Sequence, residues 1–267
     1  MRVLIEGDSF ALPHIQYVLS GLPDIFVTCN ALAGSSNAQT LHRLKKNTGI
    51  VDVNPSLIVV FQCQPFKDYK STLAMYQTSY GDNLGKCVLR EGLDYAEDII
   101  ESKLRAYYAS LCEIQLKHYP NCKLILIGGG SKVDQKLFLE VKKSYPEAQV
   151  DVLILSVLEY LFDIWNLNDD KKNKFVHHPE FFISDWYHFV NEHCDTKLYE
   201  CLSEHQDLRN KLQEKLDLIL LPDQAHMQTN AQNSICEKII KYMVDNMNYS
   251  QMGDTKSLKS TLTWSSS

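Results

Sequence analysis

Short runs of β-type residues alternate along this chain with stretches of helical periodicity, and this alternation constrains the fold more than any other feature. Strands are predicted at residues 2–6, 24–29, 56–61, 123–127, 150–155 and 216–221. Helices are predicted at residues 12–19, 93–119, 136–144, 197–215 and 231–247. Because crossovers of this length join parallel strands, the pattern predicts an α/β fold in three layers, α/β/α, with about five parallel strands.

The rhythm changes between residues 159 and 215, a stretch rich in aromatic side chains and histidines. We interpret this stretch as a helical insertion, or cap, that precedes the last strand. The rest of residues 1–249 is predicted to form one α/β domain with a flavodoxin-like sheet. Residues 250–267 are rich in Ser, Thr and Lys and have no periodicity, which predicts a flexible C-terminal tail.

Composition argues against several classes of partner. The 267 residues carry a net charge of −6, which argues against a chain that neutralises the phosphates of nucleic acids. No window approaches the roughly 20 apolar residues of a membrane helix, so no membrane partner is expected. The eight cysteines contain no C-x-x-C pair and the N-terminus shows no export signal, which predicts a reducing, cytoplasmic location. None of these features predicts the oligomeric state.

The first candidate site is Gly7-Asp8-Ser9, which follows the first predicted strand and precedes a helix. In an open parallel sheet, ligands bind at the carboxyl ends of the strands. A serine at this edge also lies near a helix N-terminus, where free N–H groups favour developing negative charge. Ser9 is therefore a candidate nucleophile, and the alternative is that it only caps the helix.

The second candidate site is Asp223-x-x-His226, which follows the last predicted strand. A serine hydroxyl becomes a good nucleophile when an imidazole removes its proton, and a carboxylate fixes the tautomer of that imidazole. A second D-x-x-H, formed by Asp185 and His188, makes His188 with Asp185 an alternative base. Either histidine, taken alone, has an equally simple explanation as a structural residue.

Together, a G-D-S at the first strand and a D-x-x-H near the C-terminus resemble the first and last motifs of the SGNH/GDSL hydrolase family. The resemblance covers roughly residues 1–155 and 216–247 and preserves the family's order of motifs. It implies an enzyme with Ser9 as nucleophile, His226 as base and Asp223 as the acid that orients the base. The chain has no G-x-S-x-G elbow, which argues against the α/β-hydrolase arrangement.

Two further positions concern the oxyanion hole that the resemblance implies. Gly34 matches the family's oxyanion glycine, with a plain turn glycine as the alternative. The family's Gly-x-Asn is absent after the third strand, where the sequence is F-Q-C-Q-P. The side-chain amide of Gln62, or alternatively of Gln64, could donate in its place, together with the backbone N–H of Ser9. One lost donor costs about 10²–10³ in rate, so this departure bears on the site geometry or the catalytic power, and what the chain resembles is a divergent, or even inactive, member of the family.

The resemblance implies hydrolysis of small acyl esters, such as acetyl groups on a carbohydrate, through an acyl-Ser9 intermediate. No cofactor is required, and the spacing of His188, His193 and Cys194 fits no four-ligand zinc site. The expected partner is a small-molecule or saccharide ester. Two alternatives stay open: an O-acyltransferase that uses an acyl-CoA donor on a saccharide, and a non-catalytic binding protein with the same fold.

Overall fold

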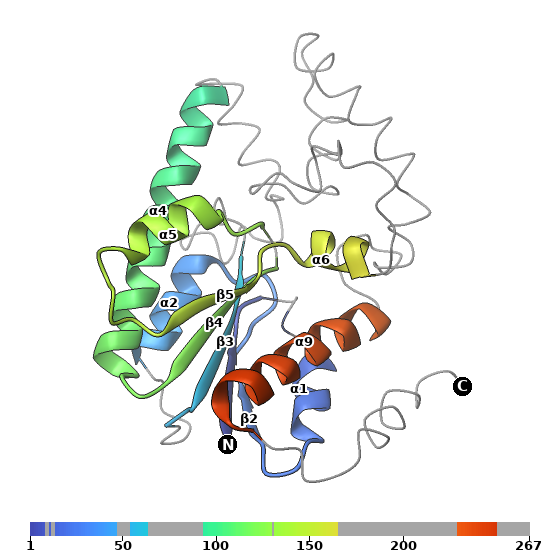
Figure 1. Ribbon diagram of the computed structural model, residues 1–267. Helices are drawn as coiled ribbons and strands as arrows, with labels where there is room; N and C mark the ends of the chain where they lie inside the picture. The colour runs from blue at the N-terminus through green and yellow to red at the C-terminus, as the bar shows by residue number, and fades with distance from the viewer. Residues whose placement is uncertain are drawn as a thin grey trace.

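A sheet of five parallel strands forms the centre of the protein in the computed structural model, which describes residues 1–8, 11, 14–46, 54–63, 93–129, 131–164 and 229–249 (Figure 1). The strands are β1 (Arg2–Glu6), β2 (Phe26–Cys29), β3 (Leu57–Gln62), β4 (Lys123–Gly128) and β5 (Val150–Ile154). Their order is β2-β1-β3-β4-β5, and every pairing between neighbours is parallel. The predicted α/β class is confirmed, and this strand order is the flavodoxin-like one.

Helices cover both faces of the sheet and complete the three layers (Figure 1). One face carries α1 (His14–Ser20) and α9 (Thr229–Met247), which pack against each other. The other face carries α2 (Asn37–Lys46), α4 (Leu93–His118) and α5 (Gln135–Lys142). On that face, α4 contacts both α2 and α5.

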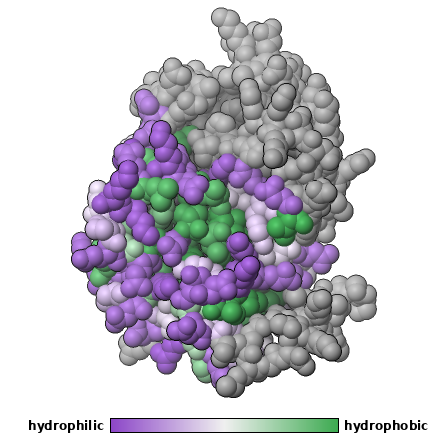
Figure 2. Space-filling model, viewed as in Figure 1, coloured by the Kyte–Doolittle hydropathy of each residue, from purple (hydrophilic) through white to green (hydrophobic). Residues whose placement is uncertain are grey.

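The central strands are buried and the edge strands are partly exposed. All six residues of β3 and five of the six residues of β4 are buried, which is why these strands are continuously apolar and do not alternate. The edge strand β5 leaves Val152 and Leu153 only partly covered. On the side of the molecule seen in Figure 2, apolar surface is visible near the middle, with polar side chains around it.

The pairing of the strands brings three carboxyl ends to one edge of the sheet. Glu6 of β1 pairs with Val60 of β3, and Gln62 of β3 pairs with Gly128 of β4. Glu6, the last residue of β1, is completely buried. Any site built on the motif after β1 therefore shares this edge with the residues that follow β3 and β4.

The C-terminal end of helix α9 is hydrogen-bonded to residues in or next to both edge strands of the sheet. The hydroxyl of Tyr242 donates to Asp151 Oδ2 of the edge strand β5 at 2.9 Å. Just after the helix, the hydroxyl of Tyr249 donates to the carbonyl of Pro23 at 3.0 Å, before the opposite edge strand β2. The side chains that α9 buries are those of Ala231, Asn233, Ile235, Cys236, Ile239, Ile240 and Met243.

The predicted elements agree with the described ones to within two residues at each end. Two helices are not predicted by the sequence analysis, α2 and α6 (Val157–Ile164), and α6 overlaps the start of the predicted insertion. The predicted helix 197–215, the strand 216–221, the rest of the insertion and the tail lie outside the described residues. Among the described helices, none has the length and hydropathy needed to cross a membrane.

Candidate functional site

The structure describes the flanks of the two predicted catalytic motifs. The predicted site residues outside the described part of the chain are Ser9, Gln64, Asp185, His188, Asp223 and His226. Gly34 and Gln62 lie within it. On the flanks, Gly7 and Asp8 are described directly before Ser9, and α9 begins at Thr229, shortly after His226.

The flanks of the two motifs meet. His14 is the first residue of α1, five residues after Ser9 in the sequence, and Asn233 lies near the start of α9, seven residues after His226. The ring nitrogen Nε2 of His14 and Oδ1 of Asn233 are hydrogen-bonded at 2.6 Å. Asn233 is buried, so the contact is part of the packing of α1 on α9. The chain therefore brings the segments next to both motifs to one corner of the fold.

Gly7 leaves β1 in a conformation that favours glycine. Its φ is +143°, and a Cβ at this position would lie 2.8 Å from the Cβ of Phe61 in β3. The chain turns at once, because the N–H of Ala11 donates to the carbonyl of Asp8 at 3.1 Å. The close approach of the chain after β1 to Phe61 of β3 therefore requires the glycine of the G-D-S motif, whatever the role of the serine.

Gly34 lies in the loop between β2 and α2. The N–H of Ser35 donates to the carbonyl of Leu32 at 3.0 Å, and Gly34, with a φ of +74°, takes the third place of this turn. The loop is tied to the end of β1, because the N–H of Leu32 donates to the carbonyl of Gly7 at 3.2 Å. The turn alone explains a glycine here, and its role in an oxyanion hole stays a prediction.

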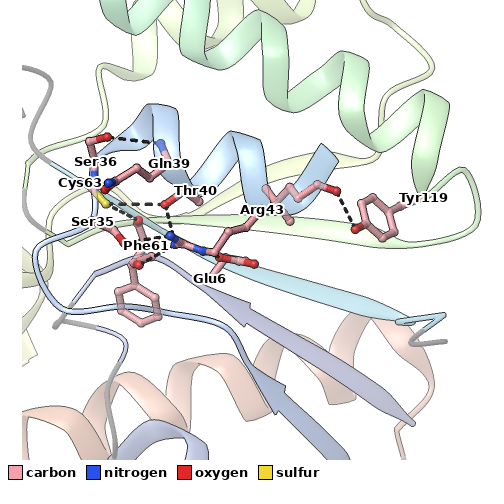
Figure 3. Close-up of polar contacts among 11 residues, drawn as sticks. Glu6, Ser35, Ser36, Gln39, Thr40, Arg43, Phe61, Cys63 and Tyr119 are labelled. Carbon is pink, nitrogen blue, oxygen red and sulfur yellow. Dashed lines mark hydrogen bonds and ion pairs between the residues drawn. The ribbon is translucent and has the colours of Figure 1, made fainter. Parts of the chain in front are cut away.

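The guanidinium of Arg43, in α2, joins the end of β1 to the loop of Gly34 (Figure 3). Its Nε donates to Glu6 Oε2 at 2.8 Å, and its Nη1 donates to Ser35 Oγ at 2.9 Å. Its Nη2 donates to the carbonyl of Gly7 at 3.1 Å and to Thr40 Oγ1 at 3.2 Å. One side chain therefore contacts the residue after Gly34 and the residue two places before Ser9.

The carboxyl group of Glu6 is the buried charge of this cluster. Burial raises the pKa of Glu6, while the charge and the hydrogen bond of Arg43 act in the opposite direction. Its side chain is fully buried and that of Arg43 is 14% exposed. A buried carboxylate is costly unless it is paired, so Glu6 and Arg43 have to stay in contact in the folded protein.

The backbone that follows β3 is held by the side chain of Asn37, near the start of α2. The N–H of Cys63 donates to Asn37 Oδ1 at 2.8 Å, and Asn37 Nδ2 donates to the carbonyl of Cys63 at 3.0 Å. Ser131 Oγ also donates to this carbonyl, at 3.2 Å. The resemblance implies a Gly-x-Asn motif at this place, and here the backbone is held by the first residue of α2 and by the loop after β4.

The side chain of Gln62 points to the loop after β4. Its Nε2 donates to Ser131 Oγ at 2.8 Å and to the carbonyl of Lys132 at 2.8 Å. An amide nitrogen carries two hydrogens, so both are used in this conformation. A contact from Gln62 to an oxyanion requires the side chain to turn, and its predicted role stays a prediction.

Sequence reasoning does not identify Glu6, Arg43 and Ser131 as parts of this edge. A signal exists for Glu6, because a carboxylate at the end of the apolar strand R-V-L-I-E needs a buried partner. Arg43 carries no such signal, since it lies among the basic residues at the end of α2. Ser131 follows a run of three glycines, which indicates a turn and nothing more specific.

Comparison with known proteins gives solved structures with weak similarity. No protein-family description matches the chain, and neither does any curated protein sequence. An acetyl-xylooligosaccharide esterase variant from Geobacillus aligns with a TM-score of 0.42 and 10% identity over 90% of this chain and 92% of its own. A GDSL-like lipase from Parabacteroides merdae aligns with a TM-score of 0.36 and 10% identity over 70% of this chain and 91% of its own. An acetyl xylan esterase aligns with a TM-score of 0.35 and 14% identity over 71% of this chain and 96% of its own. Similarities this weak identify neither a family nor an activity for this chain.

Proposed function

We propose that the chain is a serine-dependent hydrolase of acyl esters, in which Ser9 is the nucleophile, His226 the base and Asp223 the acid that orients it. The observation that carries the proposal is the hydrogen bond between His14 and Asn233, because it joins the segments that flank the two motifs. A triad whose members lie far apart in the chain requires the segments that carry them to lie close together in space.

The position of the first motif supports the same reading. Gly7 directly follows β1 at the carboxyl ends of a parallel sheet, where sites of α/β proteins form. The loop of Gly34 is tied to this edge through Leu32 and Gly7. A backbone N–H at Gly34 is therefore a reasonable oxyanion donor for chemistry at residue 9.

The proposed mechanism has two steps. His226 takes the proton of Ser9 as the serine oxygen attacks the ester carbonyl, and Asp223 stabilises the imidazolium. The N–H groups of Ser9 and Gly34, with the amide of Gln62 or Gln64, hold the oxyanion. The imidazolium protonates the leaving alcohol, which leaves an acyl-Ser9. Water, activated by the same imidazole, then releases the acid and restores Ser9.

The proposed substrates are esters of small acyl groups, such as acetyl, on a small molecule or a saccharide. This part of the proposal rests on the resemblance of the two motifs to the SGNH/GDSL family. The mechanism needs no metal and no organic cofactor, since the nucleophile, base and oxyanion donors are all protein groups.

Labelling with a fluorophosphonate probe tests the nucleophile. We expect the wild-type protein and a Ser234→Ala control to be labelled, because Ser234 lies on α9 and donates only to its own helix. We expect no labelling of Ser9→Ala. A wild-type protein that is not labelled, or a Ser9→Ala variant that is labelled equally, contradicts the proposal.

Hydrolysis of p-nitrophenyl acetate tests the base. We expect kcat to fall at least about 10³-fold in Ser9→Ala and His226→Ala, while His188→Ala keeps most of the activity. Loss of activity in His188→Ala alone transfers the role of base to His188 with Asp185. Acylation of a saccharide from acetyl-CoA, with little hydrolysis, makes the protein a transferase.

A further inference from the structure

Arg43 contacts three separate segments of the chain with one rigid group. Its partners are Glu6 and the Gly7 carbonyl at the end of β1, Ser35 in the loop after β2, and Thr40 in its own helix. Figure 3 shows the guanidinium between these partners. Four of its five N–H donors are used.

The planar geometry of the Arg43 guanidinium fixes the distances between the groups that it binds. A guanidinium is planar, so acceptors that bind its Nε and its two Nη atoms are held at set positions relative to one another. The Glu6 side chain is fully buried and the ion pair is 2.8 Å long, so the group has little freedom to reorient. The relative positions of Gly7 and Ser35 are thereby set by a side chain that belongs to neither segment.

The first turn of α2, the helix that carries Arg43, is itself anchored. The N–H of Gln39 donates to Ser36 Oγ at 3.3 Å and the N–H of Ser36 donates to Gln39 Oε1 at 2.9 Å, which closes a capping box at the start of the helix. Asn37 ties the same turn to the backbone of Cys63, after β3. The helix that carries Arg43 is therefore anchored to the strand next to β1.

We infer that Arg43 is a positioning residue, which sets the distance between the nucleophile Ser9 and the oxyanion donor Gly34. This inference rests on the proposed function. Ser9 lies two residues after Gly7, and Gly34 directly precedes Ser35, so the guanidinium holds the two reacting parts of the site through their neighbours. Catalysis of this kind is sensitive to such distances, since a displacement of about 1 Å can cost about 10²-fold in rate.

The test compares kcat per active site in Arg43→Lys and wild type. Fluorophosphonate titration counts the sites that still react, so unfolded protein does not enter kcat. We expect kcat per titrated site on p-nitrophenyl acetate to fall about 10²-fold in Arg43→Lys, with KM nearly unchanged. Lysine keeps the charge but replaces the planar fork by a single point, so it cannot hold the same acceptors together.

Arg105→Lys is the matched control. Arg105 also contacts two partners, Glu101 at 2.9 Å and Glu140 at 2.8 Å, but it is 43% exposed and joins α4 to α5. We expect its kcat per titrated site to equal that of wild type. Rescue gives a second measurement, because guanidinium ion, at concentrations far below those that unfold proteins, should restore part of kcat in Arg43→Gly and leave Arg105→Gly unchanged.

The outcomes separate the two proposals. If wild type is not labelled, the proposed function fails and the inference fails with it. If wild type is active and Arg43→Lys keeps its kcat per titrated site, only the inference is overturned, and Arg43 is a stabilising residue. Should Arg43→Lys not fold, Ser35→Ala decides, since it removes only the loop contact: about a 10-fold fall in kcat supports the inference and an unchanged kcat overturns it.

Discussion

Gly128, the last residue of β4, lies where two backbones approach too closely for a side chain. A Cβ at this position would lie 2.0 Å from the carbonyl oxygen of Leu155. The same carbonyl accepts the N–H of Val133 at 2.8 Å, so it cannot move without breaking that hydrogen bond. Gly128 also pairs with Gln62, which places this close approach at the carboxyl edge of the sheet.

Gly128→Ala should therefore lower the free energy of unfolding by at least about 2 kcal/mol, since the new methyl group forces the backbone apart. Urea unfolding followed by circular dichroism measures the change. Gly21→Ala is the control, because its Cβ would meet Val18 O at an ordinary 3.5 Å, and it should change stability by less than about 1 kcal/mol. Equal effects of the two substitutions would contradict this account.

At the residue scale, local patterns can be read from the sequence and distant pairings cannot. Ser9 is a candidate because G-D-S directly follows the first predicted strand, and Gly34 is a candidate because the resemblance to the SGNH/GDSL family implies an oxyanion glycine after the second strand. The contact between Glu6 and Arg43 joins residues 37 positions apart, and no periodicity links them. The amide of Gln62 is predicted as an oxyanion donor from its place after β3, but its hydrogen bonds to Ser131 and Lys132 depend on how β4 pairs with β3.

Three of the described helices begin with side-chain caps, and in α6 the N–H of Glu159 donates to Ser156 Oγ at 3.4 Å. In α2, Ser36 and Gln39 exchange hydrogen bonds between side chain and backbone. In α5, Asp134 is the N-cap, and its Oδ1 accepts the N–H of Leu137 at 2.9 Å. Each cap satisfies one of the N–H groups that a helix leaves without a partner in its first turn.

Asp134→Ala should cost about 1 kcal/mol of stability, because the N–H of Leu137 loses its acceptor. The backbone N–H of Asp134, which donates to the hydroxyl of Tyr108, is unaffected by the substitution. Thermal and urea unfolding measure the loss. Asp134→Asn keeps an oxygen acceptor and should stay within a few tenths of a kcal/mol of wild type. If it loses as much as Asp134→Ala, charge and not the cap hydrogen bond is responsible.

At the element scale, burial decides which elements the sequence predicts. The central strands are buried on both faces, so their apolar runs stand out. Helix α2 buries only Thr40 and Leu44, and apart from Ala38 and Leu41 its other residues are polar, so it offers little hydrophobic periodicity. Its capping box, S-N-A-Q at residues 36–39, is the signal that could have identified it.

Buried thiols affect the stability of the whole molecule. Cys122 and Cys236 are buried and unpaired, and burial raises the pKa of each thiol to about 12. An unfolded chain releases these protons at a pH near 9. Between pH 9 and 12 the folded state therefore holds protons that the unfolded state has lost. The stability that the protonated thiols give the folded state is fully present below pH 9 and is lost as the pH rises towards 12.

The free energy of unfolding should therefore fall as the pH rises above about 9, with each thiol contributing up to about 1.4 kcal/mol per pH unit. Urea unfolding at several pH values between 7 and 10.5 measures this slope. Cys236→Ala should lower stability at pH 7, because it leaves a cavity, and should give a shallower fall at high pH. Parallel curves for the variant and wild type would contradict the role of this thiol.

The place of α9 in the chain has a consequence for biosynthesis. All five strands of the described sheet exist once residue 154 has been added, but α9, which shares one face of the sheet with α1, ends only at residue 247. At about 5–20 residues per second, a ribosome needs about 5–20 seconds to add the residues in between. During this interval α1 covers its part of that face without α9, so part of an apolar face stays open, which is the kind of surface that chaperones bind and that otherwise aggregates.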